Sequence, residues 1–375
     1  MKLLFAIKSV DAPGGGAERV LSDVVAGLSK RDHTITVMTS DQVGGRSFYE
    51  FPESVEIVRC PAGSMDRPTS TKDGVRKVLA FRAAVRHRMP DVAIGFMHST
   101  YLPLGVALIG TGIPVLASEH TVFQHYLERP LQRAMLRLAP FLVARIAVVS
   151  ESVRSGYPNY LRECMAVIPN PVSTPGNRVE KVAIPGRMVI LAVGRIDEAK
   201  DHRTLLSAFA RLASSYPGWV LRIVGAGPLR PQLERQACQL GISDRVEWAG
   251  LIADVRAEYE SAEIFAMPSR YESFGLATAE ALGHSLPAIG FADCEGTSEL
   301  IVDMYNGLLI GAGDRPTQFA KALERLMQSA ALRAKLGSAG PVSIKKFAIS
   351  AVCDRWEELL LAVSKQQARI PEVAT

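Results

Sequence analysis

The sequence predicts an α/β protein made of two doubly wound parallel-sheet domains. Three observations lead to this fold class. The chain has 375 residues, enough for two typical domains. Short β-branched apolar runs alternate with helical patterns, as they do in βαβ units. The alternation stops at a turn-rich segment, residues 170–177, and then starts again, so we place the linker between the domains there.

In the first half of the chain, apolar runs bounded by turn residues predict the strands and amphipathic spacing predicts the helices. The predicted strands are 2–7, 34–39, 55–59, 92–97, 114–118, 146–150 and 166–169, and the predicted helices are 17–29, 75–87 and 127–138.

The same reasoning applies after the linker. The predicted strands are 189–193, 220–225, 246–249, 263–267 and 287–290, and the predicted helices are 204–215, 228–240, 276–283, 316–329 and 345–363. We therefore predict domains at 1–172 and 173–345, with the helical segment 346–375 packing back toward the first domain.

Composition is that of an ordinary globular protein, with 48% hydrophobic and 22% charged residues. The first residues indicate a buried strand instead of a secretory signal, and Pro140 and Arg145 interrupt the most apolar stretch, residues 138–149. Five scattered cysteines are typical of a reduced, cytoplasmic protein. We expect no nucleic-acid partner.

The net charge of +5 lies entirely within the first 170 residues. Arg129, Arg133 and Arg137 are spaced to share one helix face, and further basic residues cluster at 76–88. A solvated surface and a contact with an anionic membrane or a phosphate-bearing acceptor both remain open.

The strongest candidate site follows the strand that is predicted to end at residue 267. Gly275 forms a turn before a helix, so the N–H groups of Phe274, Gly275 and Leu276 suit an anionic ligand. Glu272 and Glu280 can face the same crevice, where carboxylates accept hydrogen bonds from vicinal hydroxyls of a sugar or ribose.

A second block places Arg195 at a strand end and Lys200 five residues later, before the next helix. Two cations on such a loop can bracket a diphosphate and stabilise the charge that grows on it. The alternative is a surface ion pair with Asp197, Glu198 or Asp201.

Glycines follow two other strands. Gly225 permits close approach of the backbone to a ligand, although a simple tight turn explains it equally well. Gly14, Gly15 and Gly16 follow the first strand but lack the last glycine of a dinucleotide fingerprint. Asp41, after the second strand, keeps a dehydrogenase as a minor alternative.

His120 ends a strand of the first domain, where crevice residues are expected, and can hydrogen-bond a substrate hydroxyl. His98 and His125 are nearby and stay unassigned. The sequence contains no Asp-x-Asp and no His/Cys/Asp cluster with ligand spacing, so we expect no metal cofactor.

Together these motifs resemble glycosyltransferase family 4. Glu272 and Glu280 match its Glu-x7-Glu element, and 192–201, 283–288 and 306–309 also fit, although Pro171 replaces a usual glycine. The resemblance implies a GT-B fold with two Rossmann-like domains facing across a cleft. It also implies a retaining transferase acting on a nucleoside diphosphate sugar, in particular a UDP-sugar.

In this resemblance, Arg195 and Lys200 hold the diphosphate, Glu280 the ribose and Glu272 the sugar. His120 lies near the anomeric carbon, and the glycine loop with Gly15 and Gly16 lies against the donor phosphates and the acceptor. The acceptor is a glycan or lipid-linked glycan of bacterial polysaccharide biosynthesis, reached from the cytoplasm or the inner face of the membrane. A GT-B sugar-nucleotide epimerase and a non-catalytic nucleotide-sugar-binding protein remain as alternatives.

Overall fold

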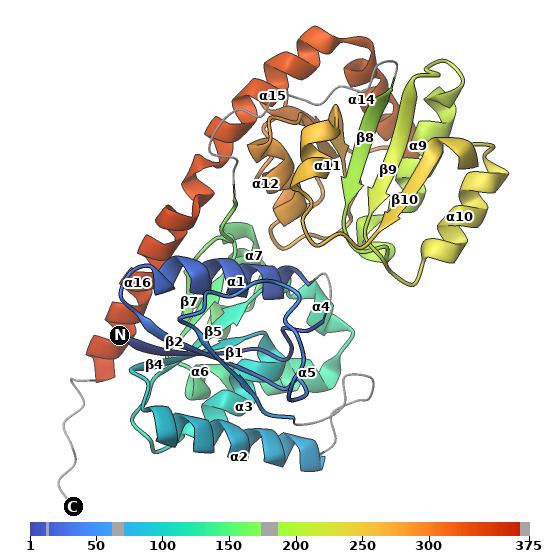
Figure 1. Ribbon diagram of the computed structural model, residues 1–375. Coiled ribbons are helices and arrows are strands. Elements are labelled where there is room, and N and C mark those ends of the chain that lie inside the picture. Colours follow the sequence, from blue (N-terminus) through green and yellow to red (C-terminus); the bar gives the residue numbers. More distant parts are fainter. Residues whose placement is uncertain (13–14, 62–70, 174–186, 368–375) are drawn as a thin grey trace, which may run out of the picture. The chain divides into compact units, whose positions relative to one another are not determined.

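The computed structural model describes residues 1–12, 15–61, 71–173 and 187–367 (Figure 1). The chain divides into two units, Met1–Pro171 with Ile349–Thr375 and Val172–Ala348. These borders differ from the predicted ones by one and three residues. The N–H of Val172 donates to the carbonyl of Phe347 at 2.8 Å, so the two segments that join the units run side by side there. Half of the predicted linker, residues 174–177, lies outside the described residues.

Unit 1 is built on a parallel sheet with strand order β3-β2-β1-β4-β5-β6-β7 (Figure 1). The order reverses between β1 and β4, and in such sheets ligands bind beside the carboxyl ends of the strands at this switch point. The strands are β1 (Lys2–Ala6), β2 (Thr34–Thr39), β3 (Glu56–Arg59), β4 (Val92–Phe96), β5 (Val115–Glu119), β6 (Arg145–Val148) and β7 (Met165–Val167).

Helices cover this sheet. They are α1 (Gly16–Ser29), α2 (Thr71–Arg88), α3 (His98–Leu108), α4 (Gln124–Leu127), α5 (Pro130–Leu136), α6 (Ala139–Leu142), α7 (Glu151–Gly156), α8 (Asn159–Arg162) and α16 (Ile349–Gln367). The last helix, α16, packs against α1 and β4 and buries Val352, Trp356, Leu360 and Val363. The spacing of these four residues is that of one helix face.

The helix predicted at 127–138 is shorter in the structure, where α5 covers residues 130–136. The neighbouring helices α4 and α6 are separate from it, because Pro130 and Pro140 each occupy a first-turn position and lack the N–H that a continuous helix needs. The predicted arginine stripe is therefore interrupted. Arg129 is the N-cap of α5 and donates to the carbonyl of His125 at 2.8 Å.

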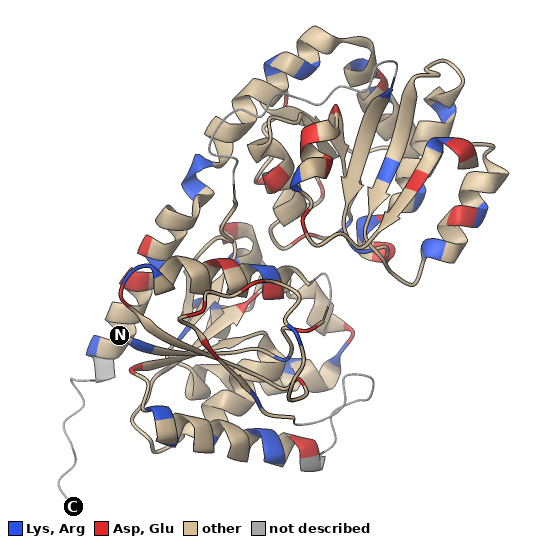
Figure 2. Cartoon of the chain, viewed as in Figure 1, with Lys and Arg blue, Asp and Glu red and all other residues tan. Residues whose placement is uncertain are grey.

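The basic residues of α2 do not form one solvated face either, although Lys and Arg recur along the helix (Figure 2). Lys77 is buried and donates to the carbonyl of Ser99 at 2.9 Å. Arg82 donates to the carbonyls of Ala107 and Ile109. Several of these cations therefore serve internal packing.

Unit 2 has a second parallel sheet, ordered β10-β9-β8-β11-β12-β13, whose switch point lies between β8 and β11 (Figure 1). Its strands are β8 (Met188–Val193), β9 (Trp219–Val224), β10 (Val246–Gly250), β11 (Ile264–Ala266), β12 (Ala288–Phe291) and β13 (Gly307–Ile310). The edge strand β13 was not predicted as a strand.

The helical elements of unit 2 include three α-helices that the sequence patterns did not indicate, α11, α13 and α15. The full set is η1 (Glu198–Lys200), α9 (His202–Ala213), α10 (Arg230–Gln239), η2 (Ser243–Arg245), α11 (Arg256–Ser261), α12 (Leu276–Gly283), α13 (Glu295–Ser298), α14 (Arg315–Gln328), α15 (Ala330–Ile344) and η3 (Lys345–Phe347). Among the helices described in either unit, none is long and apolar enough to cross a bilayer.

The contact between α1 and α16 leads to a first prediction. A Cβ on Gly27 would lie 2.4 Å from the sulfur of Cys353 and 2.9 Å from Ile349. Gly27→Val should therefore lower the free energy of unfolding of unit 1 by about 1–3 kcal/mol, the usual cost of overpacking. Gly74→Val is the matched control, because a Cβ there meets nothing within 4 Å. Equal urea midpoints for the two variants would contradict this packing.

Candidate active site

Most of the residues of unit 2 that are predicted to bind a donor lie at its switch point. Loop 194–201 follows β8 and loop 267–275 follows β11, and these two strands are neighbours. The N–H of Arg270 donates to the carbonyl of Ala199 at 2.8 Å and joins the loops. Parallel pairing places both strand ends at one edge, so segments about 70 residues apart in sequence form a single surface.

Lys200 and Glu272 form an ion pair at the centre of this surface. Ser269 Oγ donates to the same oxygen, Glu272 Oε1, at 2.9 Å. The side chains of Lys200 and Glu272 are 20% and 12% exposed, so both remain accessible while their positions are restricted. A Cβ on Gly194 would lie 3.2 Å from Lys200 Cε, and the glycine leaves room for the lysine to cross the strand end.

Arg195 is 73% exposed and pairs with a different carboxylate. Its Nε donates to Asp197 Oδ2 at 2.6 Å, which is the surface ion pair left open by the sequence. Asp197 Oδ1 also accepts the N–H of Lys200 at 3.3 Å. Within the described residues, the terminal guanidinium nitrogens of Arg195 make no hydrogen bond, and they can bind an anion.

Arg315 supports both loops, and sequence reasoning missed it. It lies at the start of α14, with its guanidinium 3.7 Å from the ring centroid of Phe291. Its Nε donates to Asp201 Oδ2 at 3.2 Å, and its NH2 donates to the carbonyls of Pro268 and Ser269 at 2.7 and 3.1 Å. No local sequence motif indicates this role of Arg315, because its partners lie in distant segments of the chain.

The predicted helix start is present. Gly275 has φ = 81° and caps α12, a left-handed conformation that favours glycine. The first-turn N–H groups beyond it lack partners within the helix. The Phe274 ring is only 4% exposed and packs edge-on against Phe347 at 5.1 Å, so the ring anchors the loop and only the backbone of Phe274 can serve a ligand.

A second glycine, Gly296, contacts the backbone of this loop. The N–H of Gly296, in α13, donates to the carbonyl of Glu272 at 3.1 Å. A Cβ on Gly296 would lie 2.7 Å from that carbonyl oxygen and 2.8 Å from the nitrogen of Phe274. The position of Glu272 therefore depends on the absence of a side chain at residue 296.

Glu280 lies one turn into α12 and is buried, with 7% exposure. Tyr259, on α11, donates its hydroxyl to Glu280 Oε2 at 2.9 Å and orients the carboxylate. The Tyr259 ring also packs against His284, at 5.1 Å between centroids. A carboxylate accepts about four hydrogen bonds, so this contact is compatible with binding a further hydroxyl.

A glycine is required at position 225 by the path of the protein backbone. It has φ = 138°, and a Cβ there would lie 2.0 Å from the carbonyl oxygen of Gly194. Loop 194–196 fills the space that a side chain would take, so the tight turn accounts for the glycine, and its contact with a ligand stays a prediction. The N–H of Ile196 donates to the carbonyl of Ala226 at 2.9 Å, so this turn positions Arg195.

In unit 1, His120 follows β5 at the carboxyl edge of the sheet. Its ring stacks on Phe96 at 5.2 Å, and Nε2 shares a hydrogen bond with Ser118 Oγ at 2.9 Å. Burial lowers the pKa of His120 to about 4, although a hydrogen bond with Asn170 opposes this effect. The imidazole is therefore neutral near pH 7.

A buried network lies beside His120. Glu119 Oε2 accepts the hydroxyls of Tyr101 at 3.0 Å and of Tyr126 at 2.9 Å, and burial raises the pKa of this carboxyl. The Tyr126 hydroxyl also bonds His98 Nδ1 at 2.9 Å. Burial, reinforced by the charges of His125, Arg129 and Lys77, lowers the pKa of His98 to about 4. Two neutral histidines thus lie at this edge.

The glycine loop of unit 1 is described only in part, since Gly14 lies outside the described residues. Gly15 caps α1, and a Cβ there would lie 1.7 Å from the Glu18 carboxylate, whereas Gly16 faces open space. Asp41 is buried and accepts from Ser9 Oγ at 2.5 Å and from the N–H of Val10 at 2.7 Å. Both carboxylate oxygens of Asp41 accept hydrogen bonds from the segment after β1. The structure therefore gives no support to the dehydrogenase alternative, in which Asp41 would bind a ribose.

The described residues contain no group of three or more His, Cys, Asp or Glu side chains arranged to hold a metal ion. The positive potential of the unit 2 site comes from Lys200, Arg195 and the start of α12.

Two family models match the chain. "Glycosyltransferase Family 4" matches residues 14–174 and "Glycosyl transferases group 1" matches residues 176–342, so together they span most of both units. The chain is a family 4 glycosyltransferase of the group 1 type. It is therefore an enzyme that transfers a sugar.

Known relatives of this glycosyltransferase are bacterial enzymes. One, from Campylobacter jejuni, is named GalNAc-alpha-(1->4)-GalNAc-alpha-(1->3)-diNAcBac-PP-undecaprenol alpha-1,4-N-acetyl-D-galactosaminyltransferase. It is 27% identical over 366 residues, covering 97% of this chain and 99% of that protein. Another, the lipopolysaccharide core biosynthesis glycosyltransferase LpsE of Rhizobium meliloti, is 32% identical over 173 residues, or 46% of this chain and 49% of that protein.

Among solved structures, Anabaena HepE in complex with UDP and glucose is similar to this glycosyltransferase. The TM-score is 0.77 at 18% identity, covering 96% of this chain and 100% of that one. This likeness, with the two parallel sheets, shows the GT-B fold.

The contact beneath Glu272 leads to a second prediction. Gly296→Ala should displace the Glu272–Phe274 backbone and lower sugar transfer by at least about tenfold, since small misplacements in a site have large effects on rate. Gly311→Ala is the control, because a Cβ there meets nothing within 4 Å. Turnover by Gly296→Ala equal to that of the control would show that the loop does not rest on residue 296.

Buried histidines lead to a third prediction. His98, His120 and His202 have pKa values near 4, lowered mainly by burial from 6.5. Between these values the unfolded chain binds more protons, so the free energy of unfolding should fall as the pH is lowered from about 6.5 toward 4. Urea unfolding at pH 7 and pH 5 measures this loss. It should be smaller in His202→Gln and unchanged in His87→Gln, whose histidine is exposed; equal losses in both variants would rule out a contribution from His202.

Proposed function

We propose that this enzyme moves a hexose-type sugar from a UDP-sugar to a glycan or lipid-linked acceptor in bacterial cell-surface polysaccharide biosynthesis, with retention and without a metal ion. The observation that supports the proposal most is the Lys200–Glu272 ion pair, a cation beside an accessible carboxylate at the switch point of unit 2. A nucleoside diphosphate sugar presents a diphosphate next to sugar hydroxyls, and this pair complements both.

In the proposed reaction, the bond between the anomeric carbon and the diphosphate oxygen breaks. The anomeric carbon bonds the acceptor oxygen, and the acceptor proton leaves with the nucleoside diphosphate. Negative charge grows on the diphosphate as its bond breaks. The ammonium of Lys200, the outward guanidinium of Arg195 and the N–H groups at the start of α12 can stabilise this charge without a metal.

Each carboxylate has its own proposed partner. Glu272, accessible and held by Ser269, would accept hydrogen bonds from hydroxyls of the transferred sugar. Glu280, buried and oriented by Tyr259, would bind the ribose. Support for a uridine donor comes from Anabaena HepE, which was solved with UDP and glucose and also with UDP-glucose. Retention rests on family membership.

The acceptor is proposed to belong to the carboxyl edge of unit 1. The neutral imidazole of His120 has one donor and one acceptor nitrogen, which suits a hydroxyl, and Gly15 and Gly16 would lie near the donor phosphates and the acceptor. The undecaprenol-linked substrate in the name of the C. jejuni relative supports a lipid-linked acceptor. We therefore propose that the enzyme works in the cytoplasm, at the inner face of the membrane.

Removing the central cation tests this site. Lys200→Ala should lower transfer by about 10²–10³-fold, the usual effect of losing one preorganised electrostatic donor. Glu280→Ala should weaken donor binding. Lys321→Ala, an exposed lysine on α14, is the control. The assay measures UDP release and acceptor modification, with unfolding midpoints to show that each variant is folded; transfer by Lys200→Ala at the rate of the control would refute the proposed donor site.

Three further readouts test the finer claims. EDTA should leave transfer unchanged, whereas a loss restored by a divalent cation would refute metal independence. The anomeric configuration of the product, read by NMR, should equal that of the donor. Incubation with the donor alone should produce no epimerised sugar, since such a product would favour an epimerase.

A further inference from the structure

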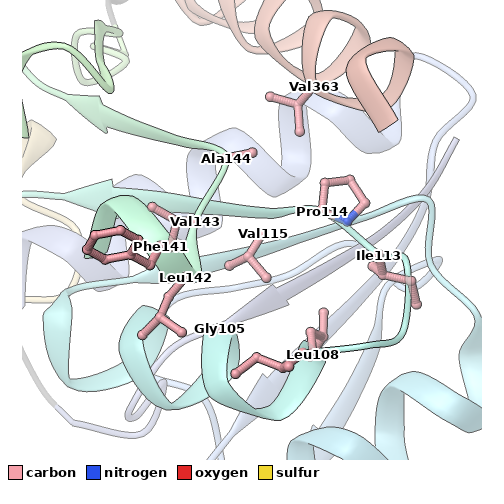
Figure 3. Close-up of a pocket in the computed structure, with 11 residues that line it drawn as sticks. Gly105, Leu108, Ile113, Pro114, Val115, Phe141, Leu142, Val143, Ala144 and Val363 are labelled. Atoms are coloured by element: carbon pink, nitrogen blue, oxygen red, sulfur yellow. The ribbon is translucent and has the colours of Figure 1, made fainter. Parts of the chain in front are cut away.

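The two edges of the unit 1 sheet differ in charge. At the amino edge lies a pocket whose lining residues carry no charged side chain, so it has no fixed cation for an anionic ligand (Figure 3). The carboxyl edge, in contrast, carries basic residues to which the proposed reaction gives no role. Lys8 follows β1 and His98 begins α3 after β4, and these two strands are neighbours. Their ends therefore meet at the switch point of unit 1.

Lys77, on α2, is a buried cation at this place. The residue is 8% exposed, and among the described residues no carboxylate forms an ion pair with it, although lysine is rarely buried without such a partner. Burial lowers its pKa to about 8, and the nearby charge of Lys8 adds to this effect. The ammonium therefore stays mostly protonated near pH 7, and its charge lacks a counterion.

The one hydrogen bond given for Lys77 has a structural cause. Its Nζ donates to the carbonyl of Ser99 at 2.9 Å. Pro103 lies inside α3 and has no N–H, so the Ser99 carbonyl lacks its helical partner, and the lysine replaces it. An ammonium has three donors, and this bond leaves donors for a ligand.

The start of α3 supplies further donors. Among the described residues, the N–H groups of His98 and Ser99 make no hydrogen bond, as in the first turn of any helix. Met97, before them, has φ = 66° and ψ = 149°, a strained conformation of the kind found at ligand sites. The Oγ1 atom of Thr100 is buried and also unpartnered in the described part of the chain. Since Lys77 contacts Ser99, cation and free N–H groups lie within one helical turn, about 5.4 Å.

The surroundings add positive charge. Burial lowers the pKa of His98 to about 4, and the neighbouring charges of His125 and Arg129 contribute to this effect. The acid beside this group, Glu119, is buried, and burial raises its pKa, which favours the neutral carboxyl. Two lysines and a helix start without a charged acid suit a multiply charged anion such as phosphate.

This place lies next to the proposed position of the acceptor hydroxyl. β4 and β5 are paired, with Phe96 opposite Ser118, and adjacent strands are about 4.8 Å apart. His98 follows β4 and His120 follows β5, so an anion at the start of α3 is close to His120. The donor diphosphate is assigned to unit 2, where Lys200 complements it. A phosphate beside His120 therefore belongs to the acceptor.

We propose that the acceptor carries a phosphate or diphosphate group close to the accepting sugar, and that Lys77, Lys8 and the start of α3 bind this group. The inference rests on the proposed function, in which unit 1 receives the acceptor, and it names the chemical class of that acceptor. A lipid-linked sugar diphosphate and a soluble sugar phosphate share this chemistry.

Calorimetry with inorganic pyrophosphate tests the site. With UDP present in saturating amount, the full chain should bind pyrophosphate at one further site. Lys77→Met and Lys8→Met should each weaken this binding by at least about tenfold, the scale of a lost charged hydrogen bond. Lys30→Met is the matched control, since Lys30 is exposed and caps the far end of α1. Equal binding by all three variants, or no binding by the parent, would overturn the proposal.

Unfolding midpoints accompany these measurements, because Lys77→Met leaves the Ser99 carbonyl without a partner. Lys8 is exposed, and its side chain makes no hydrogen bond or ion pair with the described residues. Lys8→Met should therefore keep the parent midpoint, and weaker pyrophosphate binding by this variant reports the lost charge alone. Parent-like binding by a folded Lys8→Met chain would remove Lys8 from the site.

Acceptor kinetics test the substrate class. Removing the phosphate from an acceptor should raise its KM for the parent enzyme by about tenfold or more, and Lys8→Met should then have no additional effect. Equal KM values with and without the phosphate would refute the proposal. The two sources are compared as separate acceptors, a lipid-linked sugar diphosphate and a soluble sugar phosphate. The one with the higher kcat/KM identifies the source.

UDP binding separates this proposal from the preceding one. It should be unchanged in Lys8→Met and weakened in Lys200→Ala. Weakened UDP binding in Lys200→Ala, together with parent-like pyrophosphate binding in Lys77→Met and Lys8→Met, refutes only the phosphate site. Unchanged UDP binding in Lys200→Ala refutes the donor site, whereas loss of pyrophosphate binding in Lys8→Met would still support the site in unit 1.

Discussion

The candidate donor site of unit 2 depends on one partly buried guanidinium, that of Arg315. Arg315 joins Asp201 to the carbonyls of Pro268 and Ser269, so a single side chain fixes both loops of the switch point. Asp201 has a left-handed backbone, with φ = 48°, and its carboxylate is buried. Such a conformation persists only where its surroundings determine it, and here Arg315 and Arg270 do so. Lys200 directly precedes Asp201, so its direction toward Glu272 follows from this arrangement.

Much of this site could be predicted because its residues follow strand ends. The chain order of strands and helices indicates a doubly wound sheet, and in such a sheet the ends of the strands on either side of the switch point meet. The strand-end positions predict that Lys200 and Glu272 both lie at the carboxyl edge of the sheet, and the family resemblance implies that they share one donor site. No sequence pattern shows that the charges of Lys200 and Glu272 pair, because each residue alone is also compatible with a solvated surface position.

The remaining parts depend on contacts between distant segments. Arg315 is 114 residues from Asp201, and nothing in the local pattern around α14 indicates that contact. Gly296 and Gly225 are needed because other backbone occupies the place of their side chains, and such crowding is invisible to periodicity. The start of the helix predicted at 127–138 is wrong for a different reason. The apolar spacing continues across Pro130, but in the folded chain Pro130 begins a new helix.

The charges of the two units suit different functional groups. In unit 2, Lys200 and Arg195 offer permanent positive charge, which binds phosphate oxygens strongly. At the carboxyl edge of unit 1, burial keeps His98 and His120 neutral near pH 7, and a charged imidazole would be disfavoured there. A neutral imidazole donates one hydrogen bond and accepts another, which is what a hydroxyl needs. Burial as well as residue type therefore makes the two sites chemically different, one suited to anions and the other to hydroxyls. The same reasoning applies to Lys77. Burial lowers the pKa of Lys77 to about 8, so this lysine is a weaker cation than the exposed arginines of unit 1.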